Sequence, residues 1–193
     1  MVDPIPDKVE LSSEEKESIY VHKVYDQIAK HFSNTRYNPW PVIKKYLEDQ
    51  EPGCIGADIG CGNGKYLGVR SGDMFVIGSD RSPALVEICN ERGFESMTAD
   101  NLNLPYRDNV FDFAISIAVI HHFSTESRRV AAIKEILRTL RKGGTALIYV
   151  WALEQDGKRK FEADHQDYLV PWVTKSSKKD SPNDEPNQKT YQR

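Results

Sequence analysis

The residues with the clearest potential for chemistry form the glycine-rich segment DIGCGNG, at positions 58–64 of a 193-residue chain. A short apolar run precedes it, so the segment should leave a strand, and we expect a helix to open at Gly64 or Lys65. Glycines let the backbone of such a turn approach a ligand closely. Asp58 stands two residues before Gly60 and adds a carboxylate beside the turn. This spacing predicts a cofactor-binding loop.

Two classes of cofactor bind at loops of this kind. A dinucleotide site requires G-x-G-x-x-G, whereas this chain has G-x-G-x-G and carries Lys65 where the third glycine would fall. A carboxylate at Asp58 would repel a pyrophosphate but attract an ammonium group. S-adenosylmethionine carries an ammonium group and a sulfonium and contains no phosphate, so the charges favour this cofactor over a dinucleotide.

Two more acidic residues follow where predicted strands end. Asp80 comes 20 residues after Gly60, and a carboxylate there can accept hydrogen bonds from both ribose hydroxyls. Asp100, followed by Asn101, ends a third predicted strand and could bind the adenine amine. Glycine turns and strand-end aspartates are each common in α/β proteins, but three in chain order favour a methyltransferase. The predicted cofactor-binding residues are Tyr25, Asp58, Gly60, Cys61, Gly62, Gly64, Asp80, Arg81, Asp100, Asn101 and Ile117.

The elements that must position these residues alternate between strand and helix. Ser82 is a predicted N-cap followed by Pro83 at the first helical position, and this helix should stop near Gly93. A later helix should begin after Ser124 and end at residues 142–144, KGG. Its predicted apolar face comprises Val130, Ile133, Leu137 and Leu140. The predicted strands are 54–59, 74–79, 94–98, 111–118 and 145–151. This alternation predicts an α/β fold with a doubly wound parallel sheet.

Two helices are predicted before the glycine loop. Ser12 and Glu15 fit a capping box, so one helix should run from here to about Lys30. The sequence NPWP at 38–41 breaks the pattern, and a second helix should reach about Leu47. The predicted organisation is a loose tail (1–11), one domain (12–173) whose residues 12–50 cover the cofactor, and a polar, linker-like segment (174–193).

Composition excludes several classes of protein. The net charge is -3, so the chain is no polycation, and any nucleic-acid contact would need a local basic patch. The three cysteines, Cys54, Cys61 and Cys89, show no CxxC spacing, which argues against disulfides and against a metal site. The apolar run at 113–120 is far shorter than the ~20 residues of a membrane span. We expect a cytoplasmic protein, with the nucleus as a second compartment.

The motifs together resemble those of the class I S-adenosylmethionine-dependent methyltransferases. Four stretches, NTRYNPWP, NLNLP, SIAVIHHFST and IYVWALEQ, are more specific and resemble the tRNA wobble-uridine carboxyl methyltransferases. Both the fungal enzymes and the methyltransferase domain of the tRNA-modifying AlkB homologue share them, over about residues 18–173. The resemblance implies a Rossmann-like fold with strand order 3-2-1-4-5. The final hairpin of that class is expected to be missing, as in a truncated chain.

The resemblance also implies a reaction. It is methyl transfer to the carboxylate of 5-carboxymethyluridine at the tRNA wobble position, by a catalytic subunit paired with a small zinc-binding activator protein. An ordinary carboxyl group has a pKa near ~4, so this nucleophile is already ionised and needs no general base. Two alternatives remain open: a small-molecule methyltransferase, and a cofactor-binding domain without catalysis. The expected absence of the final hairpin is the reason for considering the second.

The predicted catalytic residues are those that could hold the substrate. Arg36 offers a planar guanidinium to a carboxylate, although a surface salt bridge would explain it equally well. His121 and His122 follow the fourth predicted strand, where ligands of α/β proteins bind, and at least one of them could simply be packed. Trp151 could stack on the nucleobase or belong to the core.

Two surfaces are predicted to bind partners. Residues 124–160 hold nine basic and four acidic side chains, which predicts a patch for the tRNA anticodon loop; a solvated helix face is the alternative. The third strand, Phe94–Thr98, should lie at an open sheet edge, where the activator could add a strand. Phe75, Ile88 and Cys89 would extend an apolar patch beside it.

Overall fold

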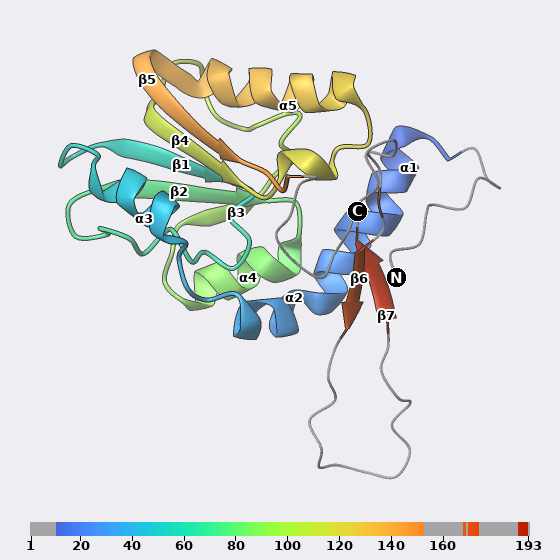
Figure 1. The fold of residues 1–193 in the computed structure, drawn as a ribbon. Helices are drawn as coiled ribbons and strands as arrows, with labels where there is room; N and C mark the ends of the chain where they lie inside the picture. The colour runs from blue at the N-terminus through green and yellow to red at the C-terminus, as the bar shows by residue number, and fades with distance from the viewer. Residues whose placement is uncertain (1–10, 153–167, 169, 174–188, 193) are drawn as a thin grey trace.

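A five-stranded parallel sheet forms the centre of the molecule (Figure 1). The computed structural model describes residues 11–152, 168, 170–173 and 189–192. The strand order β3-β2-β1-β4-β5 confirms the predicted topology, and all four pairings are parallel. The strands are β1 (Ile55–Ile59), β2 (Phe75–Asp80), β3 (Ser96–Thr98), β4 (Phe111–Ile117) and β5 (Leu140–Tyr149).

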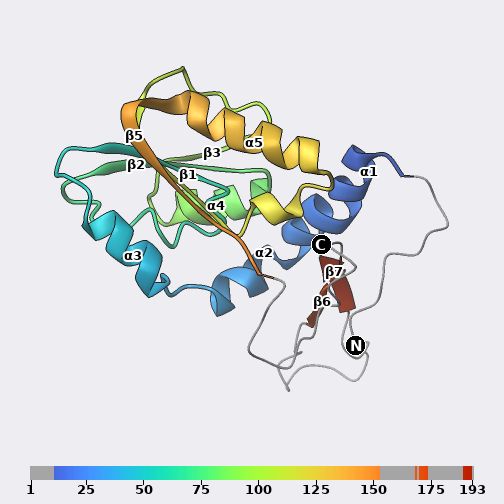
Figure 2. The same cartoon turned by 45° about the horizontal axis from the view of Figure 1, so that its top comes forward.

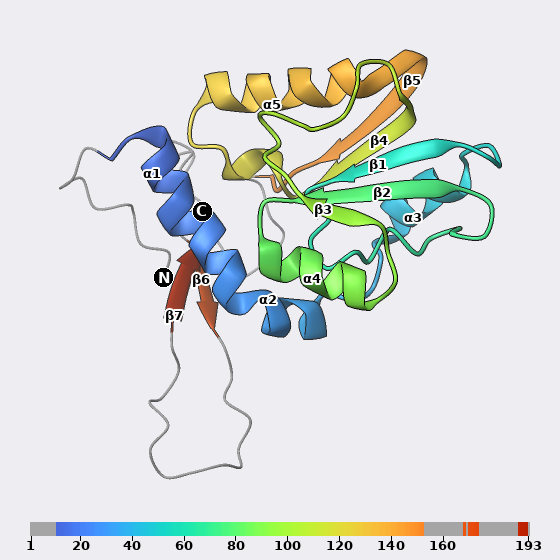
Figure 3. The ribbon, with the colours of Figure 1, turned by 180° about the vertical axis from the view of Figure 1, so that it is seen from behind.

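Helices cover both faces of this sheet, so its central strands are apolar on both sides. Helices α3 (Pro41–Glu48) and α4 (Pro83–Glu91) lie on one face, and α5 (Glu126–Thr139) lies on the other (Figures 1 and 3). On β4, Phe113 belongs to the core beneath α3, whereas Ala114 belongs to the core beneath α5. Both side chains are fully buried, as the unbroken apolar run of this strand predicts.

A long N-terminal helical segment crosses the carboxyl ends of the strands (Figure 2). It consists of α1 (Ser13–Glu17), a π-helical stretch (Ser18–His22) and α2 (Lys23–Thr35). The predicted capping box is present: Ser12 Oγ accepts from the Glu15 backbone N–H, and the Glu15 carboxylate accepts from that of Ser12. No helix in the described part of the chain is long and apolar enough to cross a bilayer.

Several local predictions were wrong. The glycine loop leads into a series of turns through Asp73 rather than into a helix. Thr125, not Ser124, caps α5, which ends at Thr139 because β5 begins at the next residue. The predicted apolar face of α5 was correct in part: Ile133 and Leu140 pack against the core, but the helix also buries Ala132 and Ile136 against the sheet. Of that predicted face, Val130 is 42% exposed and Leu137 is 52% exposed.

The final hairpin of the main sheet was predicted to be missing, and in the described residues this sheet has five strands. A separate antiparallel pair of strands is also present. It joins β6 (Val170–Val173) to β7 (Lys189–Gln192) in a second sheet, separate from the first. Strand β7 lies inside the segment 174–193 that was predicted to be a linker. Trp172 is 8% exposed and packs with Val24 and Ile28 of α2, so contacts distant in sequence order this pair. Residues 1–10, 174–188 and 193 lie outside the described part.

Strand β3 does lie at the sheet edge, but the apolar patch beside it is smaller than predicted. The strand has only three residues. Phe94 precedes it and packs against the core, and Cys89 is 0% exposed. Phe75, at 50% exposure, remains on the surface. Within residues 94–98 the exposed residues are the polar Glu95 and Thr98.

Candidate active site

A cavity of about 290 Å³ opens at the carboxyl ends of the strands, and residues of the N-terminal helical segment form part of its wall. Parallel α/β sheets bind ligands at this end, where the loops from successive strands meet. The cavity wall contains thirteen of the fifteen predicted site residues. They are Tyr25, Arg36, Gly60, Cys61, Gly62, Asp80, Arg81, Asp100, Asn101, Ile117, His121, His122 and Trp151. Asp58 and Gly64 lie outside the wall.

Asp80 holds the glycine loop in place. One carboxylate oxygen accepts the Gly62 N–H at 2.8 Å, and the other accepts the Ser82 N–H at 2.9 Å. Gly60 and Gly62 have φ angles of 83° and 56°, which residues with a Cβ rarely adopt. Burial raises the pKa of Asp80 against these hydrogen bonds. The loop is thus fixed in shape before any ligand arrives.

Asp58 lies behind this loop as an isolated carboxyl group. It is 1% exposed, and neither oxygen has a hydrogen-bond partner among the described residues. Burial, helped by the charge of Asp80, raises its pKa to about 8. A buried carboxyl group without a partner fits the ammonium of S-adenosylmethionine, which would supply the missing donor. The residues present therefore fit this cofactor.

Gly64 has a packing role. A Cβ built there would meet Cys89 Sγ at 2.9 Å and the Phe94 ring at 3.0 Å, so only glycine lets the end of the loop pack this tightly. Lys65 follows with its ammonium 4.8 Å from the centre of the Trp40 ring, at the cavity wall. It supplies a positive charge near Asp58.

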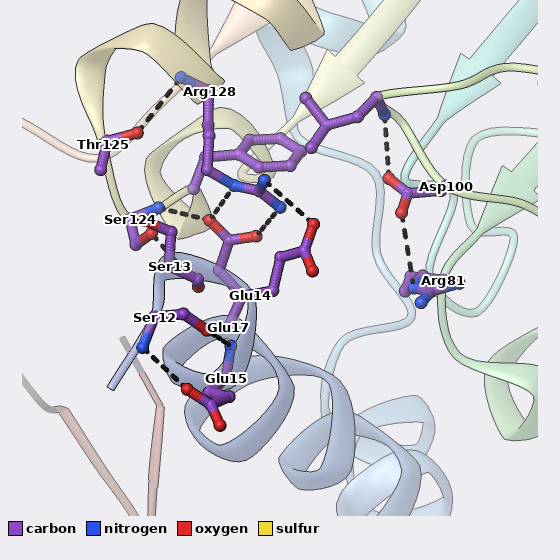
Figure 4. Close-up of polar contacts among 12 residues, drawn as sticks. Ser12, Ser13, Glu14, Glu15, Glu17, Arg81, Asp100, Ser124, Thr125 and Arg128 are labelled. Carbon is purple, nitrogen blue, oxygen red and sulfur yellow. Dashed lines mark hydrogen bonds and ion pairs between the residues drawn. The ribbon is translucent and has the colours of Figure 1, made fainter. Parts of the chain in front are cut away.

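The predicted adenine-binding pair lies at the other end of the cavity. Asp100 accepts the Leu102 N–H at 2.9 Å, and its second oxygen lies 3.9 Å from Arg81 Nε (Figure 4). Asn101 is 6% exposed and also reaches the wall. Two amide or carboxylate groups are therefore available here for an adenine amine.

A buried ion pair fixes the start of the N-terminal segment over the cavity. Glu17 is 2% exposed and accepts hydrogen bonds from Arg128 Nε at 2.9 Å and Nη2 at 2.7 Å (Figure 4). The same carboxylate accepts the Ser124 N–H at 2.7 Å. Burial acts to raise the pKa of Glu17, but the hydrogen bonds from Arg128 and Ser124 outweigh it and lower the pKa.

Three of the predicted substrate-binding side chains, His121, His122 and Trp151, form a connected aromatic group with Tyr25, which was predicted to bind the cofactor. Tyr25 Oη lies 3.1 Å from His122 Nε2, and the rings of His121 and His122 lie 4.4 Å apart. His121 also contacts the ring of Trp151 at 5.7 Å between ring centres. Burial lowers the pKa of His121 to about 4, so this side chain is neutral at physiological pH. His121 therefore brings no positive charge to the cavity.

Arg36 brings a positive charge to the cavity from the end of α2. The residue is exposed and belongs to the cavity wall. Its guanidinium carbon lies 5.2 Å from the centre of the Trp172 ring, a cation–π distance. Trp172 in turn donates its indole N–H to His31 Nδ1 at 3.1 Å. Trp172 thus packs against α2 and also belongs to the cavity wall.

The basic segment carries less free charge than its sequence suggests. Arg128, Arg138 and Arg141 each form ion pairs with carboxylates of this chain. Lys158, Arg159 and Lys160 lie outside the described residues. Contact of this segment with tRNA stays a prediction.

Sequence reasoning missed Asn63, which lies inside the glycine loop, is 1% exposed and reaches the cavity wall. A polar residue between two glycines of a cofactor loop was a signal that could have drawn attention to it. It also missed Phe32, whose place in the wall depends on how α2 lies over the sheet.

Known structures define the class of this fold. A methyltransferase-domain family matches residues 57–148. A chain in the complex of the Haloferax volcanii Trm112 methyltransferase activator with a methyltransferase has a TM-score of 0.58 and 23% identity, over 66% of this chain and 59% of that one. An S-adenosylmethionine-dependent methyltransferase of Aquifex aeolicus has a TM-score of 0.56 and 19% identity, over 70% of this chain and 78% of that one. The fold is that of a class I S-adenosylmethionine-dependent methyltransferase.

Sequence relatives narrow this class. The tRNA (carboxymethyluridine(34)-5-O)-methyltransferase of Schizosaccharomyces pombe is 54% identical over 83% of this chain and 71% of its own length. That of Saccharomyces cerevisiae is 54% identical over 85% of this chain and 60% of its length. The alkbh8 protein of Xenopus tropicalis is 59% identical over 78% of this chain but only 24% of its length. The chain belongs to the tRNA (carboxymethyluridine(34)-5-O)-methyltransferase family.

Proposed function

We propose that this chain transfers the methyl group of S-adenosylmethionine to the carboxylate of 5-carboxymethyluridine at the wobble position of tRNA. The names of the relatives supply the substrate class. The observation that carries the proposal is the pairing, in one cavity, of a preorganised glycine loop with the guanidinium of Arg36. A carboxylate substrate needs a cation or hydrogen-bond donors to orient it, and Arg36 provides both.

One group of residues would bind the cofactor, and another would bind and orient the substrate. Gly60, Gly62 and Asp80 would hold the cofactor, and Asp58 would accept its ammonium group. Once bound, the cofactor supplies an electrophilic methyl group. Arg36 orients the substrate carboxylate, and the aromatic group around Trp151 provides a surface on which a nucleobase can stack. No residue has to remove a proton, because the carboxylate is ionised at neutral pH.

The test is a single-turnover assay on tRNA that carries 5-carboxymethyluridine. Arg36→Ala should slow methyl transfer roughly 100-fold, as expected when a group that orients the reactant is lost, and should leave cofactor affinity nearly unchanged. Arg107→Ala is the matched control, because Arg107 is also exposed and lies outside the cavity wall. Full activity of the Arg36 variant, or equal methylation of small carboxylic acids and tRNA, would contradict the proposal.

We also propose that a small zinc-binding activator adds a strand at the edge of β3. A structural neighbour of this chain comes from a complex with the Trm112 activator, and β3 lies at the sheet edge. A cytoplasmic and nuclear location would follow from a tRNA substrate. The partner, the tRNA contacts and the location belong to this proposal.

A further inference from the structure

The glycine loop is tied directly to the end of α2 by the side chain of Asn63. Its amide Nδ2 donates to the backbone carbonyl of Ser33 at 3.4 Å and to that of Arg36 at 3.3 Å. Carbonyls in the last turn of a helix have no partner within the helix. One buried amide here serves two of them, and it belongs to the loop that would hold the cofactor.

Arg92, which caps the end of α4, locks Asn63 in this position. Its Nη1 donates to the backbone carbonyl of Asn63 at 2.7 Å, and its Nη2 donates to Ser33 Oγ at 2.6 Å. Asn63 is therefore bonded through both its backbone and its side chain. The network joins α4, the glycine loop and the end of α2, so a shift of the loop relative to the helix end would break these hydrogen bonds.

The geometry thereby fixes the base of the Arg36 side chain. Arg36 leaves the helical conformation, with φ -128° and ψ 42°, and its carbonyl is held by Asn63. Its guanidinium lies over Trp172. A long, exposed arginine would otherwise sample many rotamers, and ordering it costs free energy. Two anchors, one at the backbone and one at the ring, restrict where its charge can lie.

We propose that Asn63 is a positioning residue that sets the Arg36 guanidinium at a defined place relative to the cofactor loop. The inference rests on the proposed function, since it assigns Arg36 the substrate carboxylate. Asn63 itself touches no reacting atom. Its amide fixes the distance between the part of the site that would hold the methyl donor and the part that orients the acceptor.

The test uses Asn63→Asp, which keeps the shape of the side chain but replaces its donor by an acceptor facing two carbonyls. We expect the single-turnover rate to fall roughly 10- to 100-fold, the range for small displacements of positioning groups, while cofactor affinity changes less than about threefold. In the background of Arg36→Ala, the same substitution should have almost no further effect, because the two residues act through one path.

Gln50→Glu is the matched control. The Gln50 amide donates to the Tyr46 carbonyl at 2.9 Å near the end of α3, outside the cavity wall, so the chemical change is the same. It should alter neither rate nor cofactor affinity. Ser33→Ala, which removes one bond of Arg92, is a milder second variant for the case that Asn63→Asp does not fold, and should give a smaller loss of rate.

A readout independent of activity is the NMR signal of the Arg36 side-chain Nε–H. It should show increased motion in Asn63→Asp, with the signal of Arg70 unchanged. Independent, multiplicative rate losses in the double variant, or an unchanged Arg36 signal, would overturn the inference. A wild-type chain that binds the cofactor but does not methylate the tRNA would instead contradict the proposed function, and the NMR comparison would still decide the role of Asn63.

Discussion

Asp58 lowers the stability of the cofactor-free protein, and the same carboxyl group is proposed to bind the ammonium group of the cofactor. Its pKa is raised to about 8 by burial, whereas an unfolded aspartate titrates near ~3.9. Between these two values the folded state binds a proton that the unfolded state has lost, so the stability of the cofactor-free protein decreases as the pH rises through this window. A bound ammonium group would reverse this effect.

We therefore predict that Asp58→Asn stabilises the cofactor-free protein by roughly 1–3 kcal/mol at pH 8, because an amide stays neutral in this buried position without having to take up a proton. The same variant should bind S-adenosylmethionine more weakly, because the cofactor's ammonium loses its anion. Thermal unfolding at pH 5 and pH 8, with calorimetry for the cofactor, measures both. The gain in stability should shrink at pH 5, and equal gains at both values would argue against a protonated Asp58.

Asp80 differs from Asp58 because its carboxylate has hydrogen-bond partners in the folded protein. It holds Gly62 and Ser82 through their backbone N–H groups, and its loss would leave two partly buried donors without this acceptor. Asp80→Ala should weaken cofactor binding by roughly 2 kcal/mol, because a charged hydrogen-bond partner is lost. Unchanged affinity by calorimetry would exclude Asp80 from the cofactor site.

At the scale of elements, the N-terminal helical segment depends on contacts at several points along its length. Glu17 binds Arg128 and Ser124, and Tyr25 contacts His122. Breaking a buried ion pair from one side leaves the other charge uncompensated and costs roughly 3–5 kcal/mol. Arg128, which the sequence had suggested as a tRNA contact, is engaged in this pair.

Glu17→Ala should thus lower the thermal stability strongly and weaken cofactor binding, since the segment forms one wall of the cavity. Because the pKa of Glu17 is lowered in the folded protein, the contribution of this residue to stability depends on pH. Its contribution is complete above the unfolded pKa of about 4.3 and is lost as the pH falls through the lower folded value. Denaturation curves at pH 3 and pH 7 check this. Arg107→Ala, outside the network, should change neither.

At the scale of the whole molecule, the sheet edge at β3 is the place where the activator is proposed to bind. Among the residues that the structure describes, this strand pairs only with β2, so its outer side presents backbone groups without a strand partner there. We predict that amide hydrogens at residues 93–99 exchange quickly in the isolated chain and become protected when the zinc-binding activator is present. The interior strand β1 should be protected in both states. Complete protection at 93–99 in the isolated monomer would contradict the docking site.

The sequence by itself determined much of this protein, because caps, glycine turns and apolar runs act over a few neighbouring residues. The capping box at Ser12 and the Ser82-Pro83 helix start were predicted correctly from the residues, and the strand order was predicted correctly from the family resemblance. Thirteen of the predicted site residues lie in the wall of one cavity, and their roles stay predictions. Their spacing along the chain is also their spacing in the strand–loop units. Such features need no knowledge of distant segments.

Only the tertiary structure decided which distant residues meet. Glu17 and Arg128 are 111 positions apart, and His31 and Trp172 are 141 apart, so no local pattern could pair them. The same holds for the bond from Asn63 to Arg36 and for the β6–β7 pair, whose order comes from packing on α2 rather than from its own composition. These contacts form because the parallel sheet brings the ends of all its strands to one side, where the N-terminal segment closes over them.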